Sequence, residues 1–340
     1  MRDHVDFDLL AVVNSPGAAL IGDDLKRIAS EIIQDRPVIA LESPGYSRHI
    51  WDGYSKACSD LIDRLVPSKC RFASDDDMKC VNLLGLSIFH KYYQGDIIEL
   101  KRLLALCGID VNCSLCCDCS VEEIKNLRKA SLNVVVDPVY GLETAKILKQ
   151  RYNMPYLSLP GLPVGFSDTE RFIHTVSCAL SLQSSKFDVE SEKARARAYI
   201  YLSRLNSLTG LPKGAKFAVH GTASQCLAYS RFLIHYLGMS ADSISVINQD
   251  CSSADFNELQ KLLHTVYMSD ALKKDILKTN AQIVFSDGNI IAKLKALHHS
   301  FSGIEISLPS LGYTDVIPKT HLGLSGSLLI CEQVINGLMY

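Results

Sequence analysis

The sequence predicts an α/β protein built from parallel sheets. Short runs of apolar, often β-branched residues recur along the 340-residue chain, and each is followed by a turn and then by a segment with helical periodicity. The runs are apolar throughout and do not alternate with polar residues, which is typical of parallel strands covered on both faces. We therefore expect strands and helices to alternate as they do in Rossmann-like domains.

The first block of this pattern begins near the N-terminus. A strand is expected at residues 9–13, and a turn follows at Ser15, Pro16 and Gly17. The helix after this turn carries one apolar face, formed by Leu25, Ile28, Ala29, Ile32 and Ile33. A further strand and turn lie in the segment RPVIALESPGYS.

The second block has the clearest helix boundaries. It opens with the strand VNLLGL and a helix whose apolar face contains Ile97, Leu100, Leu103, Leu104 and Cys107. Gly108 is the expected stop, because glycine adopts a positive φ without strain. Ser120 with Glu123, and Ser167 with Glu170, have the spacing of capping boxes that begin helices. The strand LNVVVD and the helix LETAKILKQRY lie between them.

The third block completes the pattern and sets the expected domain boundaries. Its strands are KFAVHG, DSISVIN, AQIVFSD and GIEISLP, and its last helix is expected at residues 322–338. Two polar, turn-rich segments, SKCRFASDDDMK and NSLTGLPKGAK, separate the blocks. We therefore expect three Rossmann-like domains around a central cleft, at residues 1–78, 79–209 and 210–340.

Composition excludes several classes of protein. The chain is 47% hydrophobic and 21% charged with a net charge of −2, and it has no basic stripe interleaved with aromatic residues, so nucleic acid is not an expected partner. No apolar run reaches the roughly 18 residues that a membrane span requires. The N-terminus lacks the pattern of a signal peptide, so we expect a cytoplasmic protein whose twelve cysteines are thiols or metal ligands.

Candidate binding residues follow the predicted strands, because ligands of parallel sheets bind at the carboxyl ends of strands. No dinucleotide fingerprint or phosphate-binding loop is present. Asp137 either caps the turn before Pro138 or acts as a carboxylate ligand or proton donor. Thr222 either only caps a helix or, with Gly221, binds an anionic group at the helix N-terminus. His220 and His321 are the histidines expected to face the cleft.

Four cysteines lie within seven positions, at Cys113, Cys116, Cys117 and Cys119. Thiolates are ligands for zinc and iron–sulfur clusters, so these residues are candidate metal ligands. The adjacent Cys116 and Cys117 do not easily point at one metal, and the paired CxxC spacing of zinc sites is absent. The alternative is that these are buried thiols that pack as small apolar side chains.

Several segments, taken in order, resemble one known family. They are PGAALIGDDLKRI, VNLLG with DIIELKRLLALCGIDVN, SVEEIKNLRKASLNVVVD, YGLETAKILKQRYNMPYLSLP, FAVHGTASQCLAYSRFLIHYLG and TDVIPKTHLGLSGSLLICEQVINGLM. Together these segments resemble nitrogenase component 1, the superfamily of the molybdenum-iron protein, its assembly scaffold and the dark-operative protochlorophyllide reductases. The resemblance implies three Rossmann-like domains, a similar partner subunit, and electrons from an ATP-dependent iron–sulfur protein.

The chain departs from this family at positions that bind metal. Pro16 stands where the family has a cysteine of its electron-entry cluster, and the other cluster cysteines belong to an N-terminal segment that the match does not include. Asp137 stands where the nitrogenase cofactor has its cysteine, and Leu322, next to His321, stands where it has its histidine. We therefore expect a protein that does not fix nitrogen, with a shortened first domain.

Three classes of function fit these observations. The chain is a redox subunit that reduces a small molecule or tetrapyrrole, a scaffold for metallocofactor assembly, or a cofactor-free protein that binds another ligand. An iron–sulfur cluster or metallocofactor fits the first two classes, and no cofactor fits the third. For the redox subunit, the first of these classes, we expect Asp137, His220 and His321 as catalytic residues, and Ser15, Pro16, Gly17, Gly221 and Thr222 as cofactor-binding residues.

An apolar patch near the N-terminus predicts association. Pro16, Ala18, Ala19 and Leu20 follow one another closely in the first predicted turn. Such a patch is costly to expose, so we expect a dimer with a second copy or with a related subunit. The alternative is that the family's N-terminal segment, which the match does not include, forms part of this face, and that the isolated chain is then a monomer.

Overall fold

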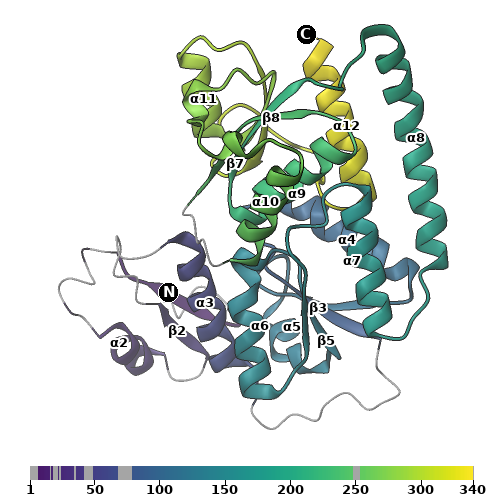
Figure 1. Cartoon of the computed structure of the whole chain (residues 1–340). Coiled ribbons are helices and arrows are strands. Elements are labelled where there is room, and N and C mark those ends of the chain that lie inside the picture. Colours follow the sequence, from purple (N-terminus) through teal and green to yellow (C-terminus); the bar gives the residue numbers. More distant parts are fainter. Residues whose placement is uncertain are drawn as a thin grey trace. The chain divides into compact units, whose positions relative to one another are not determined.

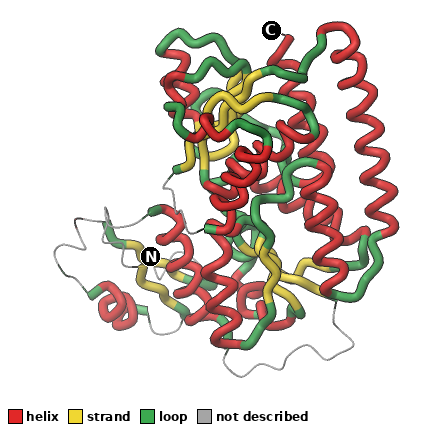
Figure 2. The backbone as a smooth tube through the Cα atoms, in the orientation of Figure 1, coloured by secondary structure: helices red, strands yellow, loops and turns green. Residues whose placement is uncertain are grey.

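The computed structural model describes most of the chain (Figure 1), namely residues 7–15, 17, 22, 24–33, 36–41, 49–67, 79–247 and 253–339. Three sheets alternate with helices along the sequence, one in each block that the sequence predicts (Figure 2). The strand pairs β1–β2, β3–β5, β7–β8, β7–β9 and β9–β10 are all parallel. The prediction of an α/β fold with parallel sheets is thereby confirmed.

Two compact units contain these sheets. The first comprises Met1–Gly85, Val111–Val135 and Tyr140–Leu157, and the second comprises Leu86–Asp110, Val136–Val139 and Ser158–Tyr340. The chain therefore crosses between the units several times. The three domain boundaries expected from the sequence stay a prediction.

The first unit holds a two-stranded and a four-stranded sheet. Strands β1 (Leu10–Val13) and β2 (Val38–Leu41) pair in parallel, with Leu10 opposite Val38. The larger sheet has the order β4-β3-β5-β6, from β4 (Asp110–Ser114), β3 (Cys80–Leu84), β5 (Leu132–Val135) and β6 (Tyr156–Ser158). The helices are α2 (Leu25–Ile32), α3 (Ile50–Leu65), α5 (Val121–Lys125), the 3-10 helix η2 (Leu127–Lys129) and α6 (Pro138–Tyr152).

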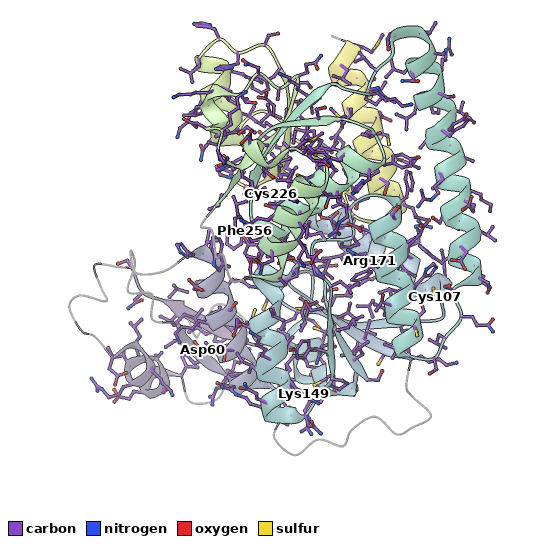
Figure 3. All side chains as sticks on the ribbon, in the orientation of Figure 1. Asp60, Cys107, Lys149, Arg171, Cys226 and Phe256 are labelled. Atoms are coloured by element: carbon purple, nitrogen blue, oxygen red, sulfur yellow. The ribbon has the colours of Figure 1, made fainter. Side chains whose placement is uncertain are left out.

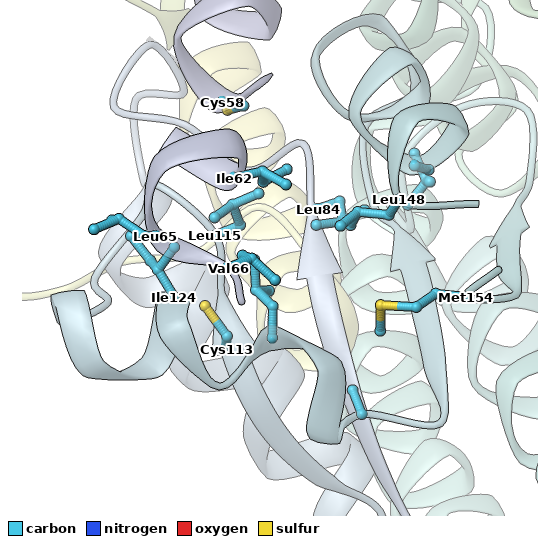
Figure 4. Packing of buried hydrophobic residues seen from close by; sticks show 14 residues of the cluster. Cys58, Ile62, Leu65, Val66, Leu84, Cys113, Leu115, Ile124, Leu148 and Met154 are labelled. Atoms are coloured by element: carbon cyan, nitrogen blue, oxygen red, sulfur yellow. The ribbon is translucent and has the colours of Figure 1, made fainter. Parts of the chain in front are cut away.

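The core of this unit joins α3 to the four-stranded sheet. Cys58, Ile62 and Leu65 of α3 pack in one cluster with Leu84 and Cys113, which come from strands β3 and β4 (Figure 4). All five residues are at most 5% exposed. The cluster fixes α3 against strands that follow it later in the chain.

The second unit is built around one four-stranded parallel sheet with the order β10-β9-β7-β8. Its strands are β7 (Lys216–Gly221), β8 (Ser240–Val246), β9 (Ile283–Asp287) and β10 (Ser302–Ser307). Its helices are α4 (Tyr93–Leu106), α7 (Phe166–Ala179), α8 (Ser185–Thr209), α9 (Ala223–His235), α10 (Ala254–Thr265), α11 (Gly288–Ala296) and α12 (Gly323–Met339), with 3-10 helices η3 (Ser269–Leu272) and η4 (Ile276–Lys278).

Two predicted helix boundaries are confirmed and one is wrong. Helix α4 is followed by Gly108 at a φ of +73°, and Ser120 with Glu123 forms the capping box of α5. Ser167 does not begin α7, because that helix starts one residue earlier, after Gly165 at a φ of +82°. Glu170 instead accepts hydrogen bonds from Arg195 of α8, at 2.9 and 2.7 Å.

Helices α2 and α8 also differ from the sequence prediction. On α2 only Ala29 is buried, whereas Ile28 and Ile32 are 38% and 62% exposed. The sheet of two four-residue strands beside this helix is too small to cover a full helix face. Helix α8 extends to Thr209, so the start of the predicted linker NSLTGLPKGAK is helical and the chain turns only at Gly210. No helix in the described residues combines the length and apolarity needed to cross a membrane.

Candidate functional site

A buried carboxylate and a buried histidine meet in the second unit. Asp137 follows β5, and His90 lies in the segment that leads from β3 into α4. The Nε2 atom of His90 is 2.9 Å from Oδ2 of Asp137. The Asp137 side chain is fully buried and that of His90 is 6% exposed. The pair is therefore shielded from water, which strengthens the electrostatic interaction between them.

The surroundings of His90 indicate where its ring carries a proton. The backbone N–H of Ser87 donates to Nδ1 at 3.2 Å, so Nδ1 is the acceptor in the neutral ring and Nε2–H donates to Asp137. Burial alone would lower the pKa of His90. The hydrogen bond to Asp137 and the negative charge of that residue, together with the charge of Asp96 and the backbone of Ser87, outweigh burial and raise the pKa of His90 above its ordinary value.

Asp137 also receives hydrogen bonds on its other oxygen. The hydroxyl of Ser224, in the first turn of α9, donates to Oδ1 at 2.7 Å, and the backbone N–H of Val139 donates to the same atom at 2.9 Å. The bond from Val139 is the turn cap that the sequence suggested for Asp137. Ser224 in turn lies 3.0 Å from the hydroxyl of Thr222. A continuous hydrogen-bonded path thus joins His90 to the N-terminus of α9.

Thr222 and Gly221 serve the start of α9. Thr222 is the N-cap, and it forms a capping box in which its hydroxyl accepts from the N–H of Gln225 and Gln225 accepts from the N–H of Thr222. A Cβ on Gly221 would stand 2.6 Å from Oε1 of Gln225, so a larger residue would disturb the box. The carboxylate of Asp137 reaches the first turn of α9 through Ser224. Gly221 and Thr222 thus form the N-terminal cap of this helix. Their role in binding a cofactor stays a prediction.

Both ring nitrogens of His321 are hydrogen-bonded within the protein. Nδ1 lies 2.8 Å from the hydroxyl of Tyr229, on α9, and Nε2 lies 2.8 Å from Oε1 of Gln333, on α12. Burial lowers the pKa of His321 to about 4. The side chain is therefore neutral near pH 7, with Nε2–H donating to Gln333. Helix α9, on which Cys226 is labelled in Figure 3, contacts both Asp137 and His321. Cys226 itself is fully buried.

Asp96 fixes the segment that carries His321. Its Oδ1 atom accepts from the hydroxyl of Thr320 at 2.7 Å and from the backbone N–H groups of His321 and Leu322 at 3.0 and 3.2 Å. Burial raises the pKa of Asp96 to about 6, although these three donors oppose the shift. Next to Asp96, Gly95 leaves room for the backbone of Lys319, which a Cβ would overlap.

His220 forms a separate, partly open group at the carboxyl ends of three neighbouring strands. Its Nδ1 atom is 2.9 Å from the hydroxyl of Ser245, at the end of β8, and its Nε2 atom is 3.7 Å from Asp287, at the end of β9. The side chains of His220 and Asp287 are 17% and 13% exposed. Burial lowers the pKa of His220, and the charge of Asp287 only partly opposes this effect. This edge of the sheet is where the sequence predicted a site.

The cofactor-binding residues predicted in the first block belong to the first unit. Ser15 and Gly17 are exposed, whereas Pro16 lies outside the described residues. The same holds for Ala18, Ala19 and Leu20, the rest of the apolar patch on which the predicted dimer depends. The cofactor-binding role of the first turn and the dimer through the apolar patch therefore stay predictions.

The four clustered cysteines lie at the end of β4 and in the loop that follows. Cys113 and Cys117 are buried, and Cys116 and Cys119 are partly buried. A hydrogen bond from Cys113 lowers the pKa of Cys119 to about 7, with help from the backbone N–H groups of Cys116 and Cys117. Within the described ranges, no three His, Cys, Asp or Glu side chains are close enough to hold a metal ion. The geometry therefore does not gather these thiols around one point.

His90, Ser224 and Tyr229 also belong to this site, although the sequence did not predict them. His90 carries a usable signal, since it follows a buried strand in a parallel sheet and lies just before a helix. Ser224 and Tyr229 lie inside a helix, where a polar side chain gives no indication of its partner. Their contacts with residues about ninety positions away depend on tertiary structure.

Comparison with known proteins places the chain in a family. The sequence model of the family described as nitrogenase component 1 type oxidoreductase matches residues 1–339. One subunit of the light-independent protochlorophyllide reductase of Prochlorococcus marinus is 26% identical over 352 aligned residues, which cover 99% of this chain and 64% of the relative. The corresponding subunit of Gloeothece citriformis is 32% identical over 163 residues, which cover 47% of this chain and 32% of the relative.

A solved structure agrees in fold. The structure described as "Nitrogenase Cp1 at pH 6.5" has a TM-score of 0.78 and 17% sequence identity, and the match covers 98% of this chain and 75% of that one. The present chain spans just under two thirds of the length of the Prochlorococcus subunit. Taken with the family match over residues 1–339, these likenesses show that the chain belongs to the nitrogenase component 1 type oxidoreductase family.

Proposed function

We propose that the chain is a subunit of a cytoplasmic, nitrogenase-like oxidoreductase that reduces a small molecule or a tetrapyrrole. Family membership supports an oxidoreductase, and the relatives are named as reductase subunits. In this proposal a second copy or a related subunit completes the enzyme, and an ATP-dependent iron–sulfur protein delivers electrons. Nitrogen is not the substrate, because Asp137 and Leu322 replace the cysteine and histidine that the family resemblance leads one to expect.

The observation that carries the proposal is the buried Asp137–His90 pair. Reduction of a carbon–carbon or similar double bond consumes protons as well as electrons. His90, whose pKa is raised beside Asp137, retains a proton at a higher pH than an ordinary histidine does. The hydroxyls of Ser224 and Thr222 extend the pair toward the carboxyl end of β7. The role of this group in our proposal is to hold and pass a proton.

The described thiols do not fit an iron–sulfur cluster held by this chain alone. Such clusters are bound by several cysteine thiolates, and no set of three suitable side chains comes together in the described ranges. We therefore assign the electron-carrying group to the assembled complex and derive no step through it.

A cofactor-free ligand-binding protein is the second candidate. It is favoured by His321, since both of its ring nitrogens already have partners inside the protein. A histidine in this state is not available as a metal ligand without rearrangement.

Anaerobic purification of the tagged chain from its native cell tests the proposal. We expect a related subunit to co-purify and the complex to reduce a tetrapyrrole probe, protochlorophyllide, only when ATP and an iron–sulfur reductase are added. A chain that purifies alone, free of iron and inactive with every reductase supplied by that cell, would support the second candidate.

A further inference from the structure

Two thiols that are distant in sequence touch in the first unit. The Sγ atoms of Cys58, on α3, and Cys116, in the loop after β4, are 3.5 Å apart, although the residues are 58 positions apart. Both residues belong to the same compact unit. The contact therefore results from the packing of α3 against this loop, and it does not follow from closeness along the chain.

The two thiols differ in access to solvent. Cys58 is 1% exposed and lies in the core cluster beside Ile62 (Figure 4). Cys116 is partly exposed and has a φ of +58° in its loop. The hydroxyl of Tyr54 donates to the carbonyl of Leu115 at 3.3 Å, which ties the same loop to α3. A small reagent can thus reach Cys116 first, while Cys58 lies behind it.

We propose that Cys58 and Cys116 form a reversible disulfide, and that this dithiol is a redox-modification site separate from the reductase function. A disulfide has an S–S bond of about 2.05 Å, so the sulfurs need to approach by roughly 1.5 Å. Because Cys116 lies in a loop and Cys58 lies in the core of a helix, we expect the approach to come from Cys116. Disulfides of cytoplasmic proteins are usually transient or redox-sensing, in agreement with a reversible bond.

The oxidant is a small-molecule disulfide such as oxidised glutathione. The hydrogen bond with Cys58 and burial raise the pKa of the Cys116 thiol, so only a small fraction of Cys116 is ionised near pH 7 and the first step is slow. That thiolate attacks one sulfur of the reagent, forms a mixed disulfide and releases one small thiol. Cys58 then loses its proton to water and attacks the sulfur of Cys116, which forms the protein disulfide and releases the second small thiol. The two cysteines lose two electrons and two protons, and the reagent gains them.

Mass spectrometry of the full chain tests this proposal. Protein reduced and purified without oxygen is treated with oxidised glutathione, its remaining thiols are alkylated, and it is digested. We expect a peptide pair joined through Cys58 and Cys116, removed by dithiothreitol. The closed link should also raise the Tm by about 5 °C. The proposal would be overturned if Cys58 and Cys116 were still alkylated after full treatment. It would also be overturned if the disulfide formed between Cys113 and Cys119.

Variants separate this pair from the other thiols. Cys116→Ser should abolish both the linked peptide and the rise in Tm, and Cys58→Ala should do the same if it folds. Cys178→Ser is the matched control, because Cys178 is exposed on α7 in the other unit, and it should retain both effects. Since the wild-type peptide map stands on its own, a Cys58 variant that fails to fold does not weaken the test.

Discussion

His90 and Asp137 are 47 positions apart in the chain, and their side chains meet at 2.9 Å where solvent scarcely reaches either. Ser87 fixes one ring nitrogen of His90, and Ser224 and Val139 hold the far oxygen of Asp137. Each partner is thus held in place by groups other than the pair itself. This arrangement makes the protonation of His90 sensitive to a single change at Asp137.

Asp137→Asn should lower the pKa of His90, because burial keeps acting while the two largest effects that oppose it, the hydrogen bond to Asp137 and the charge of that residue, are weakened or lost. Ring-nitrogen NMR of His90 against pH measures this directly. In the wild type, the raised pKa contributes stability that is complete below about pH 6.5 and is lost as pH rises through the folded pKa. The variant should not show this loss, and an unchanged titration of His90 would contradict the assignment.

The lowered pKa of His321 should make stability depend on pH in the opposite direction to the raised pKa of His90. Its pKa is about 4 in the fold and about 6.5 in the unfolded chain, so below pH 6.5 only the unfolded state gains a proton. The free energy of unfolding should therefore fall by up to about 3 kcal/mol between pH 6.5 and 4. His321→Gln should flatten this slope in urea denaturation. The control His264→Gln, at an exposed position, should keep the wild-type slope.

Gly95→Ala should destabilise the protein by about 2 kcal/mol or more, because the new Cβ would overlap the backbone of Lys319. Gly53→Ala is a matched control inside another helix, α3, where nothing lies within 4 Å of the new methyl group. That substitution should stabilise the protein by up to about 1 kcal/mol. Chemical denaturation of both variants distinguishes a steric effect from helix propensity, and equal stability changes would refute the close approach of Lys319.

Local sequence patterns predicted the elements better than their contacts. The strands, the stop at Gly108, the box at Ser120 and the cap at Thr222 were predictable because each depends on a few neighbouring residues. The prediction from Ser167 was wrong, because the N-cap of α7 is Gly165, two residues earlier. A capping pattern in the sequence cannot show that Glu170 has a stronger partner in Arg195, on another helix.

Part of the site was also predictable from local sequence patterns, which show where a residue lies relative to strands and helices. Asp137 follows a strand, His220 lies at the carboxyl end of one and His321 precedes a helix, and His90 lies in the same kind of position, between a strand and a helix. The pairing of His90 with Asp137 depends on tertiary structure, which the sequence pattern does not give. His321 was predicted as a catalytic residue, but only the structure shows that Tyr229 and Gln333 occupy both of its nitrogens.

Thr222→Ala should cost about 1 kcal/mol of stability, because the first turn of α9 loses its cap. Thr222→Ser keeps the hydroxyl and should restore most of that energy. Thermal unfolding at one pH compares the two variants with the wild type. If serine and alanine are equally destabilising, the hydroxyl of Thr222 does not cap α9.

The proton-holding role of the Asp137–His90 pair is tested most directly by turnover of the assembled complex. Product formed per complex should be measured with ATP in excess for the wild type, for Asp137→Asn and for Asp270→Asn, whose carboxylate lies on the surface. We expect Asp137→Asn to assemble normally and to lose about 100-fold in rate, while Asp270→Asn keeps the wild-type rate. An assembled Asp137→Asn complex that turns over as fast as the wild type would contradict the account.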